Sequence, residues 1–504
     1  MKQLELGEIR NGFPVLEKKD RETLLLLADD IQFHSGVATI ARQVVLGTCH
    51  YFNWVQLGGA MKHPHEGKKV NIDIAVANEI GLKDPSVEIF CISGYGSPHL
   101  VRDILHSYDI SAIFHITDPR FWNWLYSMRA ELETICPVIY LDLWDCPPVP
   151  AWNEPFYRSS DLLLNINRQT HQFVKTLLKD NVFDLYKSDY NNSLQQLPKL
   201  IDYVPHGQDE NTFFKINKTD EKVVNLKKEI FNDKADDIKF ICFYNNRNIR
   251  RKMLIDLIIA YRDFCLDDEK KINSTALILH TDAKDENGTD LSVVINDLAN
   301  ELNIIIIEKK ISPQEMNVLY NLSDVTINIG SNEGFGLSSL ESIMTETMII
   351  NNTTGGLQDQ MRFEDENGRW IEFTEEFPTN HNGRYKKCGE WAIPIFPKTR
   401  SIQGSIPTPY IFDDRCDWED VSKAILKVYE MSQEEREIRG KKGREWVLSK
   451  ESRMSTTEMS HHIIMDINLL LEKWIPTRTI EMINVNKELE KKKTINMGIL
   501  KSEL

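Results

Sequence analysis

The sequence has 504 residues, 41% hydrophobic and 27% charged, and this length allows two large domains, each with its own buried core. Its 76 Asp and Glu residues outnumber its 60 Lys and Arg residues, and the net charge of −16 disfavours non-specific binding to DNA or anionic membranes. The N-terminus lacks the apolar core of a signal peptide, no run approaches the about 18 apolar residues of a spanning helix, and the eight cysteines form no Cys-x-x-Cys pair. We therefore expect a cytoplasmic protein without integral membrane association.

Apolar strands alternate with helices through the first part of the chain. The predicted strands are residues 23–28, 87–92, 112–116, 138–141 and 161–165. The helices between them include residues 38–46, 100–107 and 121–132. This alternation is typical of a doubly wound α/β domain, which binds ligands at the carboxyl ends of its strands. Candidate site residues there are Gly36, in a loop that is either ligand-facing or a plain βα turn, His115 and Asp118.

A domain boundary is predicted near residue 222. The turn Pro205-His206-Gly207-Gln208-Asp209 precedes a polar segment, residues 215–237, that we interpret as a linker. A second series of strands follows at residues 240–244, 276–280, 304–308, 325–329 and 347–350. We therefore divide the chain into a first domain (1–222), a second domain (223–450) and a C-terminal part (451–504).

A basic segment follows the first strand of the predicted second domain. Residues 245–252 read Asn-Asn-Arg-Asn-Ile-Arg-Arg-Lys, and a helix is predicted after them. Such clusters are usually solvated loops, but this one follows a strand end, where open sheets bind ligands. Fixed cations at that position would stabilise negative charge on a departing diphosphate. Only one or two of the four basic residues, Arg247, Arg250, Arg251 and Lys252, need face the phosphates.

The most informative segment is residues 324–356, which predict a strand, a Gly-rich turn, a helix and a second strand that ends in Thr-Thr-Gly-Gly. The start of the helix offers free N–H groups and a positive dipole end to a phosphate. Glu333 and Glu341, eight positions apart, can accept hydrogen bonds from hydroxyl groups on either side of that phosphate. Ribose, diphosphate and sugar follow one another in this way in a nucleotide-sugar.

The rest of the chain holds an insertion and several helices. Residues 363–417 are rich in Gly, Pro and aromatic residues and predict an ordered irregular insertion. It could shape an acceptor site, form an oligomer contact or pack as a surface flap. Helices are predicted at residues 418–431, 433–448 and 455–474, and residues 488–493 predict a charged helix near the C-terminus.

These motifs resemble those of retaining nucleotide-sugar glycosyltransferases with the GT-B fold, especially family 4, whose mark is Glu-x7-Glu. The resemblance implies two Rossmann-like domains that face each other across a cleft, with C-terminal helices that cross back to the first domain. It also implies that Arg247 and Lys252 bind the donor diphosphate, that Glu333 holds donor-sugar hydroxyls and that Glu341 holds the ribose. The backbone from Gly334 through Phe335 and Gly336 to Leu337 would bind the part between.

The resemblance also bears on catalysis and cofactors. Family members often carry a histidine at a strand end near the donor sugar or acceptor, which makes His115 a candidate; Asp118 would be an acceptor contact or base. Otherwise His115 is a structural histidine. The pairs Asp142 with Asp145 and Asp413 with Asp414 could suggest a metal, but GT-B enzymes usually need none, so we expect no obligatory metal or cofactor.

Three alternatives remain at this stage. A phage-type DNA glycosyltransferase would transfer the sugar to hydroxymethylated bases and would need a basic cleft on the first domain. The nucleotide-sugar 2-epimerases share the fold but lack the combination of Arg-x4-Lys with Glu-x7-Glu. A non-catalytic GT-B module would only bind a nucleotide or a partner. The leading interpretation is transfer from a nucleotide-diphosphate sugar to a hydroxyl of a glycan or small molecule.

Overall fold

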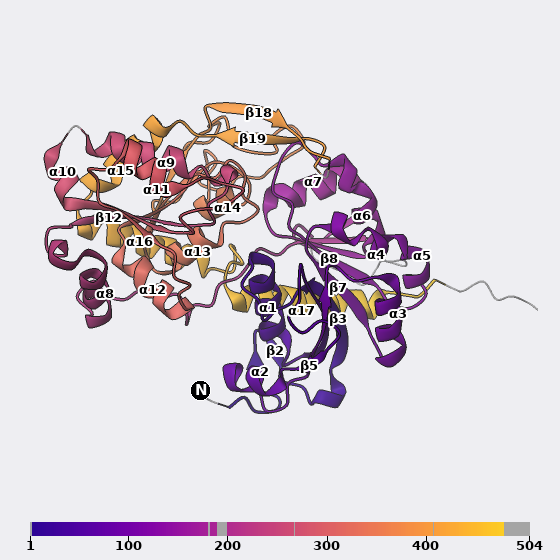
Figure 1. The fold of residues 1–504 in the computed structure, drawn as a ribbon. Coiled ribbons are helices and arrows are strands. Elements are labelled where there is room, and N and C mark those ends of the chain that lie inside the picture. The colour runs from indigo at the N-terminus through magenta and orange to yellow at the C-terminus, as the bar shows by residue number, and fades with distance from the viewer. Residues whose placement is uncertain (1–2, 180–181, 189–198, 267, 407, 478–504) are drawn as a thin grey trace, which may run out of the picture.

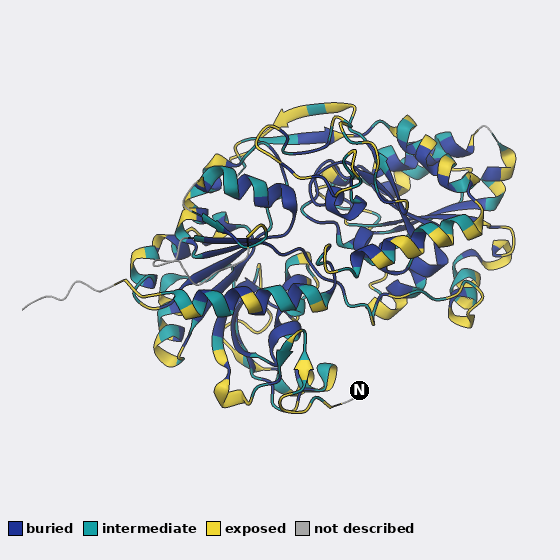
Figure 2. Cartoon of the chain, turned by 180° about the vertical axis from the view of Figure 1, so that it is seen from behind, coloured by how far each residue is buried: buried dark blue, intermediate teal, exposed yellow. Residues whose placement is uncertain are grey.

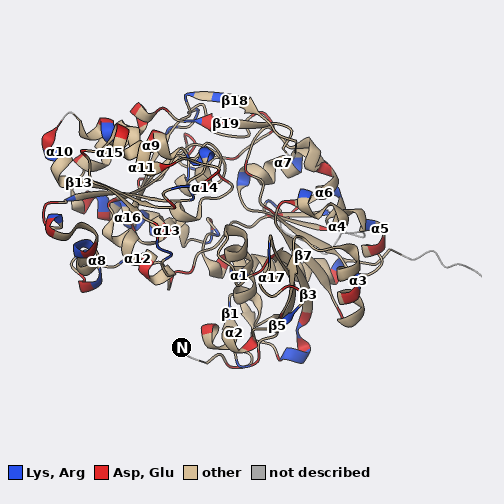
Figure 3. Cartoon of the chain, viewed as in Figure 1, with Lys and Arg blue, Asp and Glu red and all other residues tan. Residues whose placement is uncertain are grey.

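The chain folds into two α/β domains, each built on a mainly parallel sheet with helices on both faces (Figure 1). The computed structural model describes residues 3–179, 182–188, 199–266, 268–406 and 408–477. Buried residues concentrate in the strands of both sheets, whereas exposed residues lie on the outer helices and loops (Figure 2). Acidic and basic residues are interspersed over those helices (Figure 3).

The first sheet has nine strands in the order β10-β11-β9-β8-β7-β3-β4-β6-β5. Their bounds are β3 Glu22–Asp29, β4 Phe52–Ala60, β5 Lys69–Asn71, β6 Val87–Ser93, β7 Ala112–Ile116, β8 Val138–Asp142, β9 Leu162–Asn165, β10 Val182–Asp184 and β11 Lys199–Tyr203. All neighbours are parallel except β5 and β6. The chain leaves β3 in one direction for β4 and returns on its other side at β7, so a topological switch point lies between β3 and β7, where such sheets bind ligands.

The sheet is held by strands that are apolar on both faces. Leu24 to Leu27 of β3 are fully buried, as expected for a central parallel strand covered by helices on each side. Strand β4, which the sequence analysis did not find, is also buried almost throughout, although Gln56, Gly58 and Gly59 interrupt its apolar run. A short antiparallel pair, β1 (Ile9–Arg10) and β2 (Phe13–Pro14), precedes the sheet.

The helices of the first domain include those predicted at residues 38–46 and 100–107, together with two that were not predicted, at residues 73–80 and 154–159. The helices are α1 Gly36–Thr48, α2 Asp73–Ile80, α3 Pro98–Ser107, α4 Asn123–Ser127, α5 Arg129–Leu132, α6 Glu154–Ser159 and α7 Arg168–Leu178. The single helix predicted over residues 121–132 is wrong: a 3-10 turn at Pro119–Trp122 is followed by the short helices α4 and α5. The breaks fall at Trp122 and Met128, whose backbones leave the helical region while their side chains are buried in the core.

The second sheet has six parallel strands in the order β14-β13-β12-β15-β16-β17. Their bounds are β12 Phe240–Asn245, β13 Thr275–His280, β14 Ile304–Ile307, β15 Val325–Asn328, β16 Met348–Asn352 and β17 Ala392–Ile395. The helices are α9 Leu254–Cys265, α10 Glu269–Ser274, α11 Leu291–Leu298, α12 Pro313–Leu322, α13 Leu337–Met344, α14 Leu357–Met361, α15 Trp418–Glu430 and α16 Gln433–Val447. A capping box between Ser312 and Glu315 fixes the start of α12.

Two segments have more regular secondary structure than the sequence indicated. The segment predicted as a linker contains α8 (Glu221–Phe231), which packs on α12 of the second domain. The segment predicted as an irregular insertion contributes the edge strand β17 and a hairpin of β18 (Thr399–Gln403) and β19 (Ile411–Arg415), which lies across the two domains at the top of Figure 1. The Phe412 N–H donates to the Pro147 carbonyl at 2.8 Å, so the hairpin joins both domains. The boundary near residue 222 stays a prediction.

The last described helix, α17 (Thr456–Lys473), packs against α1 of the first domain, as predicted for a helix that crosses back (Figure 1). Gly47 of α1 allows this close approach, because a Cβ atom there would lie 2.0 Å from the Ser460 Oγ. The helix predicted at residues 488–493 lies outside the described residues. Within the described residues, none of the helices combines the length and apolar character needed to cross a membrane.

Candidate functional site

A cavity of about 720 Å³ opens between the carboxyl edges of the two sheets. The first domain contributes the loop after β3 and the start of α1, together with residues that follow β8, β9 and β11. The second domain contributes the loops after β12, β13 and β14 and the turn between β15 and α13. The predicted site residues that line it are Gly36, Arg247, Lys252, Glu333, Gly334, Phe335, Gly336, Leu337 and Glu341.

Lys252 and Glu333 form the centre of the cavity's charged cluster. The Lys252 Nζ lies 2.7 and 2.6 Å from the two carboxylate oxygens of Glu333, and both side chains are only 7% exposed. Arg251 donates to the same carboxylate at 3.0 Å. Burial by itself would raise the pKa of Glu333, but the charges of Lys252 and Arg251 outweigh burial and lower that pKa to about 2. Glu333 is therefore ionised at neutral pH.

The backbone around residues 250–253 explains why Lys252 reaches Glu333. Residues Arg250–Lys252 form a 3-10 turn, and Met253 takes a left-handed conformation (φ 56°) before α9 begins at Leu254. The Ser331 N–H donates to the Arg251 carbonyl at 2.7 Å, which joins this turn to the loop that carries Glu333. The ion pair is thus fixed by backbone contacts as well as by charge.

Glycines let the Glu333 loop pack tightly. Gly336 has φ 89°, a conformation that other residues adopt only with strain, and it ends the loop where α13 begins. At Gly355 (φ 47°) a Cβ atom would lie 1.9 Å from the Glu333 carbonyl oxygen, and at Gly356 a Cβ atom would lie 2.3 Å from the Gly334 carbonyl oxygen. The Gly356 N–H donates to the Glu333 carbonyl at 3.0 Å. The two glycines after β16 therefore allow the backbone there to pack directly against the Glu333 loop.

Helix α13 places its N-terminus and Glu341 on the same cavity. The first N–H groups of a helix have no intrahelical acceptor, so Leu337 and Ser338 present the positive end of α13 to the cavity. Glu341, one turn further, accepts hydrogen bonds from the Tyr320 hydroxyl at 2.8 Å and from the Gln208 amide at 3.1 Å. Burial raises the pKa of Glu341 to about 7. Glu333 and Glu341 thus lie in one cavity with opposite pKa shifts.

Arg247 lines the cavity but lies apart from the Glu333 cluster. Its guanidinium donates to Asp285 at 2.6 and 3.2 Å, and its side chain is 60% exposed. Arg251, which the sequence ranked below Arg247, is the arginine that contacts Glu333. Only the turn at residues 250–252 decides this, since all the arginines of the segment follow the same strand.

His115 and Asp118 do not line the cavity that the other predicted residues share. His115 is fully buried, with its ring nitrogens 2.8 Å from the Tyr126 hydroxyl and 3.0 Å from the Thr117 hydroxyl, and burial lowers its pKa to about 3. Asp118 caps the following 3-10 turn and pairs with Arg120. This geometry favours the structural alternative for His115, and a role in the site for His115 or Asp118 stays a prediction.

The structure adds residues that sequence reasoning did not assign to this site. Asp145, which the sequence analysis weighed only as a metal candidate, lines the cavity from the first domain. His206 also lines the cavity, and burial lowers its pKa to about 3. Gln208, in the turn before the predicted linker, donates a hydrogen bond to Glu341. The position of Asp145 after a predicted strand was a usable signal for its location, whereas the contact of Gln208 with Glu341 joins two domains and has no local sequence signal.

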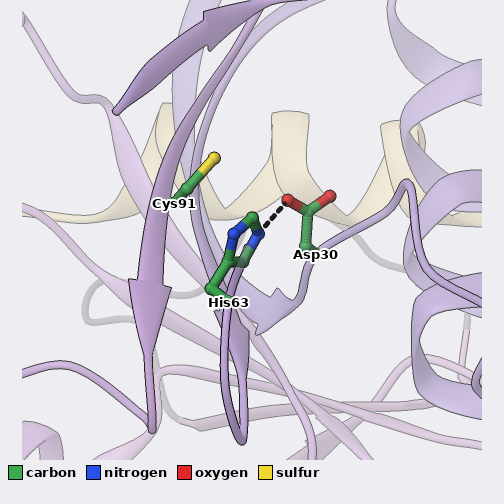
Figure 4. A group of neighbouring side chains, drawn as sticks. All are labelled: Asp30, His63 and Cys91. Atoms are coloured by element: carbon green, nitrogen blue, oxygen red, sulfur yellow. Dashed lines mark hydrogen bonds and ion pairs between the residues drawn. The ribbon is translucent and has the colours of Figure 1, made fainter. Parts of the chain in front are cut away.

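One group of described residues brings together three side chains of metal-binding types: Asp30, His63 and Cys91 (Figure 4). All are buried, and their ligand atoms lie within 4.8 Å of one another. The His63 Nδ1 accepts a hydrogen bond from the His65 N–H at 3.0 Å, so the ring proton is on Nε2, which donates to Asp30 at 2.9 Å. That nitrogen then has no lone pair for a metal. The group is explained by the hydrogen-bonded pair, and the absence of an obligatory metal stays a prediction.

Comparisons with known proteins give structural matches. A glycosyltransferase from Rickettsia africae aligns with 90% of this chain and 99% of its own, with a TM-score of 0.59 and 14% identity. Sucrose-phosphate synthase from Thermosynechococcus elongatus aligns over 90% and 100%, with a TM-score of 0.59 and 13% identity. Anabaena Alr3699/HepE in complex with UDP and glucose aligns over 89% and 99%, with a TM-score of 0.56 and 11% identity.

No protein-family model and no curated protein sequence matches the chain. At these identities the structural likeness establishes the fold. The chain has the two-domain GT-B architecture, in which Rossmann-like domains face each other across a cleft and a C-terminal helix packs back on the first domain. The predicted fold class is confirmed.

Proposed function

We propose that the protein is a retaining glycosyltransferase that moves a sugar from a nucleotide-diphosphate donor to a hydroxyl acceptor. The observation that carries the proposal is the convergence of Lys252, Arg251, Glu333, Glu341 and the start of α13 on one cavity between the domains.

Charge explains how the donor would be held. Lys252 and Arg251 carry two positive charges against the one negative charge of Glu333, so these three side chains keep an excess positive charge; Lys252 is 7% exposed and Arg251 41% exposed. A diphosphate placed between this cluster and the start of α13 would meet both charge and N–H donors. Glu333 would then accept hydrogen bonds from hydroxyls of the donor sugar. Glu341 would accept hydrogen bonds from the ribose hydroxyls through the remaining lone pairs of its carboxylate oxygens.

The chemistry requires positioning and charge neutralisation. The bond between the anomeric carbon and the diphosphate oxygen breaks, the acceptor oxygen bonds to that carbon on the same face, and the hydroxyl proton passes to the departing diphosphate. Lys252, Arg251 and the α13 N–H groups would stabilise the charge that builds on the diphosphate, and removal of one such donor typically costs about a hundred- to a thousandfold in rate. The route needs no protein nucleophile.

Two lines of support favour the retaining class and a UDP-sugar donor. The Glu-x7-Glu spacing, held on a strand, loop and helix, matches the mark of family 4. Solved structures with the same fold include Alr3699/HepE with UDP-glucose and an Escherichia coli protein with UDP-2-fluoro glucose. UDP-glucose is therefore the first donor to test.

The test is donor turnover with purified protein. Thermal stabilisation by a panel of nucleotide-sugars selects the donor, and release of the nucleoside diphosphate is then followed with and without acceptors. NMR of the product should show the anomeric configuration of the donor. The proposal is supported if the wild-type protein turns over the donor, Lys252→Ala abolishes this turnover, and Lys284→Ala, at an exposed lysine, leaves it intact.

Other outcomes point to the alternative classes. Binding of donors with no turnover under any condition would indicate a non-catalytic module. Release of nucleotide with epimerised sugar would indicate the 2-epimerase class. A product of inverted configuration would contradict the retaining assignment while leaving the transferase assignment in place.

A further inference from the structure

Charge is distributed unequally over the two walls of the cavity. The four Lys and Arg residues that line it, Arg247, Arg251, Lys252 and Lys310, all belong to the second domain. The described residues of the first-domain wall include no Lys or Arg. Besides its two histidines, that wall consists of small, hydroxyl-bearing and aliphatic residues and one carboxylate: Ser35, Gly36, Val37, Thr39, Ile40, Leu143, Ile166 and Asp145.

Asp145 is the charged group of this wall, and it lies against the Glu333 loop. It follows β8 by three residues, its Cβ lies 3.5 Å from where a Cβ on Gly334 would stand, and its carbonyl oxygen lies 3.2 Å from the same position on Gly355. One carboxylate oxygen accepts a hydrogen bond from the Cys146 thiol at 2.8 Å. In the described part of the chain the carboxylate has no ion-pair partner and no second hydrogen bond.

The start of α1 is a positive feature of this wall, and the Asp29 carboxylate offsets it. The start of α1 faces the cavity at Gly36, where a helix dipole would attract an anion. Directly behind it, the Ser35 hydroxyl that caps the helix also donates to the Asp29 carboxylate at 2.6 Å. His206 is neutral, since burial lowers its pKa to about 3. An anionic acceptor would thus meet the Asp145 carboxylate, with Asp29 behind the start of α1, and no Lys or Arg among the described lining residues of this wall. Arg251 belongs to the opposite wall; burial lowers its pKa, but the charges of Glu333 and Asp145 outweigh burial and raise it.

We propose that the acceptor is an uncharged polyhydroxyl compound, such as an unphosphorylated sugar, and that the Asp145 carboxylate binds one of its hydroxyls beside the donor sugar. This inference rests on the proposed function and names its acceptor class. An ionised carboxylate accepts hydrogen bonds from hydroxyls, whereas it repels a phosphate at close range. Sugar phosphates and the phosphate-rich backbone of DNA are both disfavoured at this wall, although the second-domain wall has the cations that a donor diphosphate needs.

The experiment compares matched acceptors with the donor that the protein turns over. Neutral mono- and disaccharides are tested against their phosphate esters and against a duplex that contains hydroxymethylcytosine. We expect transfer to a neutral sugar, with kcat/KM at least about tenfold above that for its phosphate ester, because the Asp145 carboxylate repels the phosphate. Transfer that favours the ester or the duplex, or no transfer to any neutral acceptor while the donor is turned over, overturns the inference.

A variant links the preference to Asp145. Asp145→Asn should lower kcat/KM for the neutral acceptor by about ten- to a hundredfold, the value of a hydrogen bond to a charged group, and should lower donor hydrolysis much less. It should also narrow the gap between the neutral sugar and its phosphate ester, which a merely structural role would not do. Exposed Asp109, at the opposite end of the sheet, gives the control Asp109→Asn.

The two proposals fail differently. If wild-type protein neither binds nor hydrolyses any nucleotide-sugar, the proposed function fails. If the donor is turned over but Asp145→Asn lowers transfer and hydrolysis equally and leaves acceptor preference unchanged, only the acceptor inference fails.

Discussion

The Lys252 ammonium lies within 2.7 Å of both carboxylate oxygens of Glu333, in a cavity wall where each side chain is 7% exposed. The two residues are 81 positions apart and come from the loops after neighbouring strands β12 and β15. A buried ion pair of this kind is expensive to desolvate and is weak evidence for stability by itself. Its position, next to the start of α13, fits a role in holding a donor whose charges would share the same lysine.

The first prediction separates the role of Lys252 in activity from its role in stability. Lys252→Ala should lower turnover by about a hundred- to a thousandfold, because the departing diphosphate loses a fixed cation. It should also lower the free energy of unfolding by about 3–5 kcal/mol, because Glu333 stays buried without its main partner. Urea unfolding and diphosphate release measure the two effects.

The double variant Lys252→Ala/Glu333→Gln provides the control for this prediction. It removes both charges, so it should recover much of the stability and none of the activity. Recovery of turnover in the double variant would show that Lys252 acts only through folding.

The second prediction concerns which arginine acts on the donor. Arg251 contacts Glu333, whereas Arg247 is paired with Asp285 and is 60% exposed, where its charge is screened by solvent. Arg251→Ala should lower kcat/KM for the donor by about a hundredfold, and Arg247→Ala by less than about tenfold. Steady-state kinetics decide between them. A larger loss in Arg247→Ala would restore the sequence-based choice of Arg247 and require that its guanidinium leave Asp285 when the donor binds.

The third prediction follows from the raised pKa of Glu341, about 7 against an ordinary 4.5. Between these values the folded state binds more protons than the unfolded state, so stability falls as pH rises through this range. The loss in the free energy of unfolding is absent below the pKa of the unfolded state and complete above the pKa of the folded state. It amounts to at most about 3 kcal/mol. Glu341→Gln should abolish this pH dependence and should be more stable than wild type above pH 7.

Donor affinity should follow the opposite trend, because ribose hydroxyls donate to the ionised carboxylate. The KM for the donor should fall as pH rises through about 7 in wild type and stay flat in Glu341→Gln. A flat wild-type profile would mean that Glu341 does not contact the donor.

The fourth prediction tests the support of the Glu333 loop. Gly355→Ala places a Cβ 1.9 Å from the Glu333 carbonyl, so the loop must move and turnover should fall by more than about tenfold. Gly368 also has a positive φ (76°), but a Cβ there meets nothing within 4 Å. Gly368→Ala should therefore show only the strain of about 1–2 kcal/mol and keep its turnover. Equal effects of the two substitutions on turnover would remove any special role for the Thr-Gly-Gly turn.

The sequence predicted most of the strands that are buried on both faces. Central parallel strands such as β3, β12 and β15 read as short apolar runs, because no face of theirs meets water. Strand β4 was not predicted because its glycines and Gln56 interrupt the apolar run. The reason for Gly58 lies in the tertiary packing, since a Cβ atom there would lie 2.8 Å from the Ile89 side chain. Helix α8 was not predicted because a polar surface helix and a polar linker have similar compositions.

By itself the sequence determined the alternation of strands and helices, and hence the fold class and the strand ends at which a ligand site must lie. It also determined the Glu333 and Glu341 spacing, which depends on local geometry alone. Only the tertiary structure decided that Arg251 rather than Arg247 meets Glu333, that His115 is enclosed by core aromatic residues, and that Asp145 faces the cavity from the other domain. These outcomes depend on contacts between segments far apart in the chain, and local residue patterns do not encode which of several similar side chains such a contact selects.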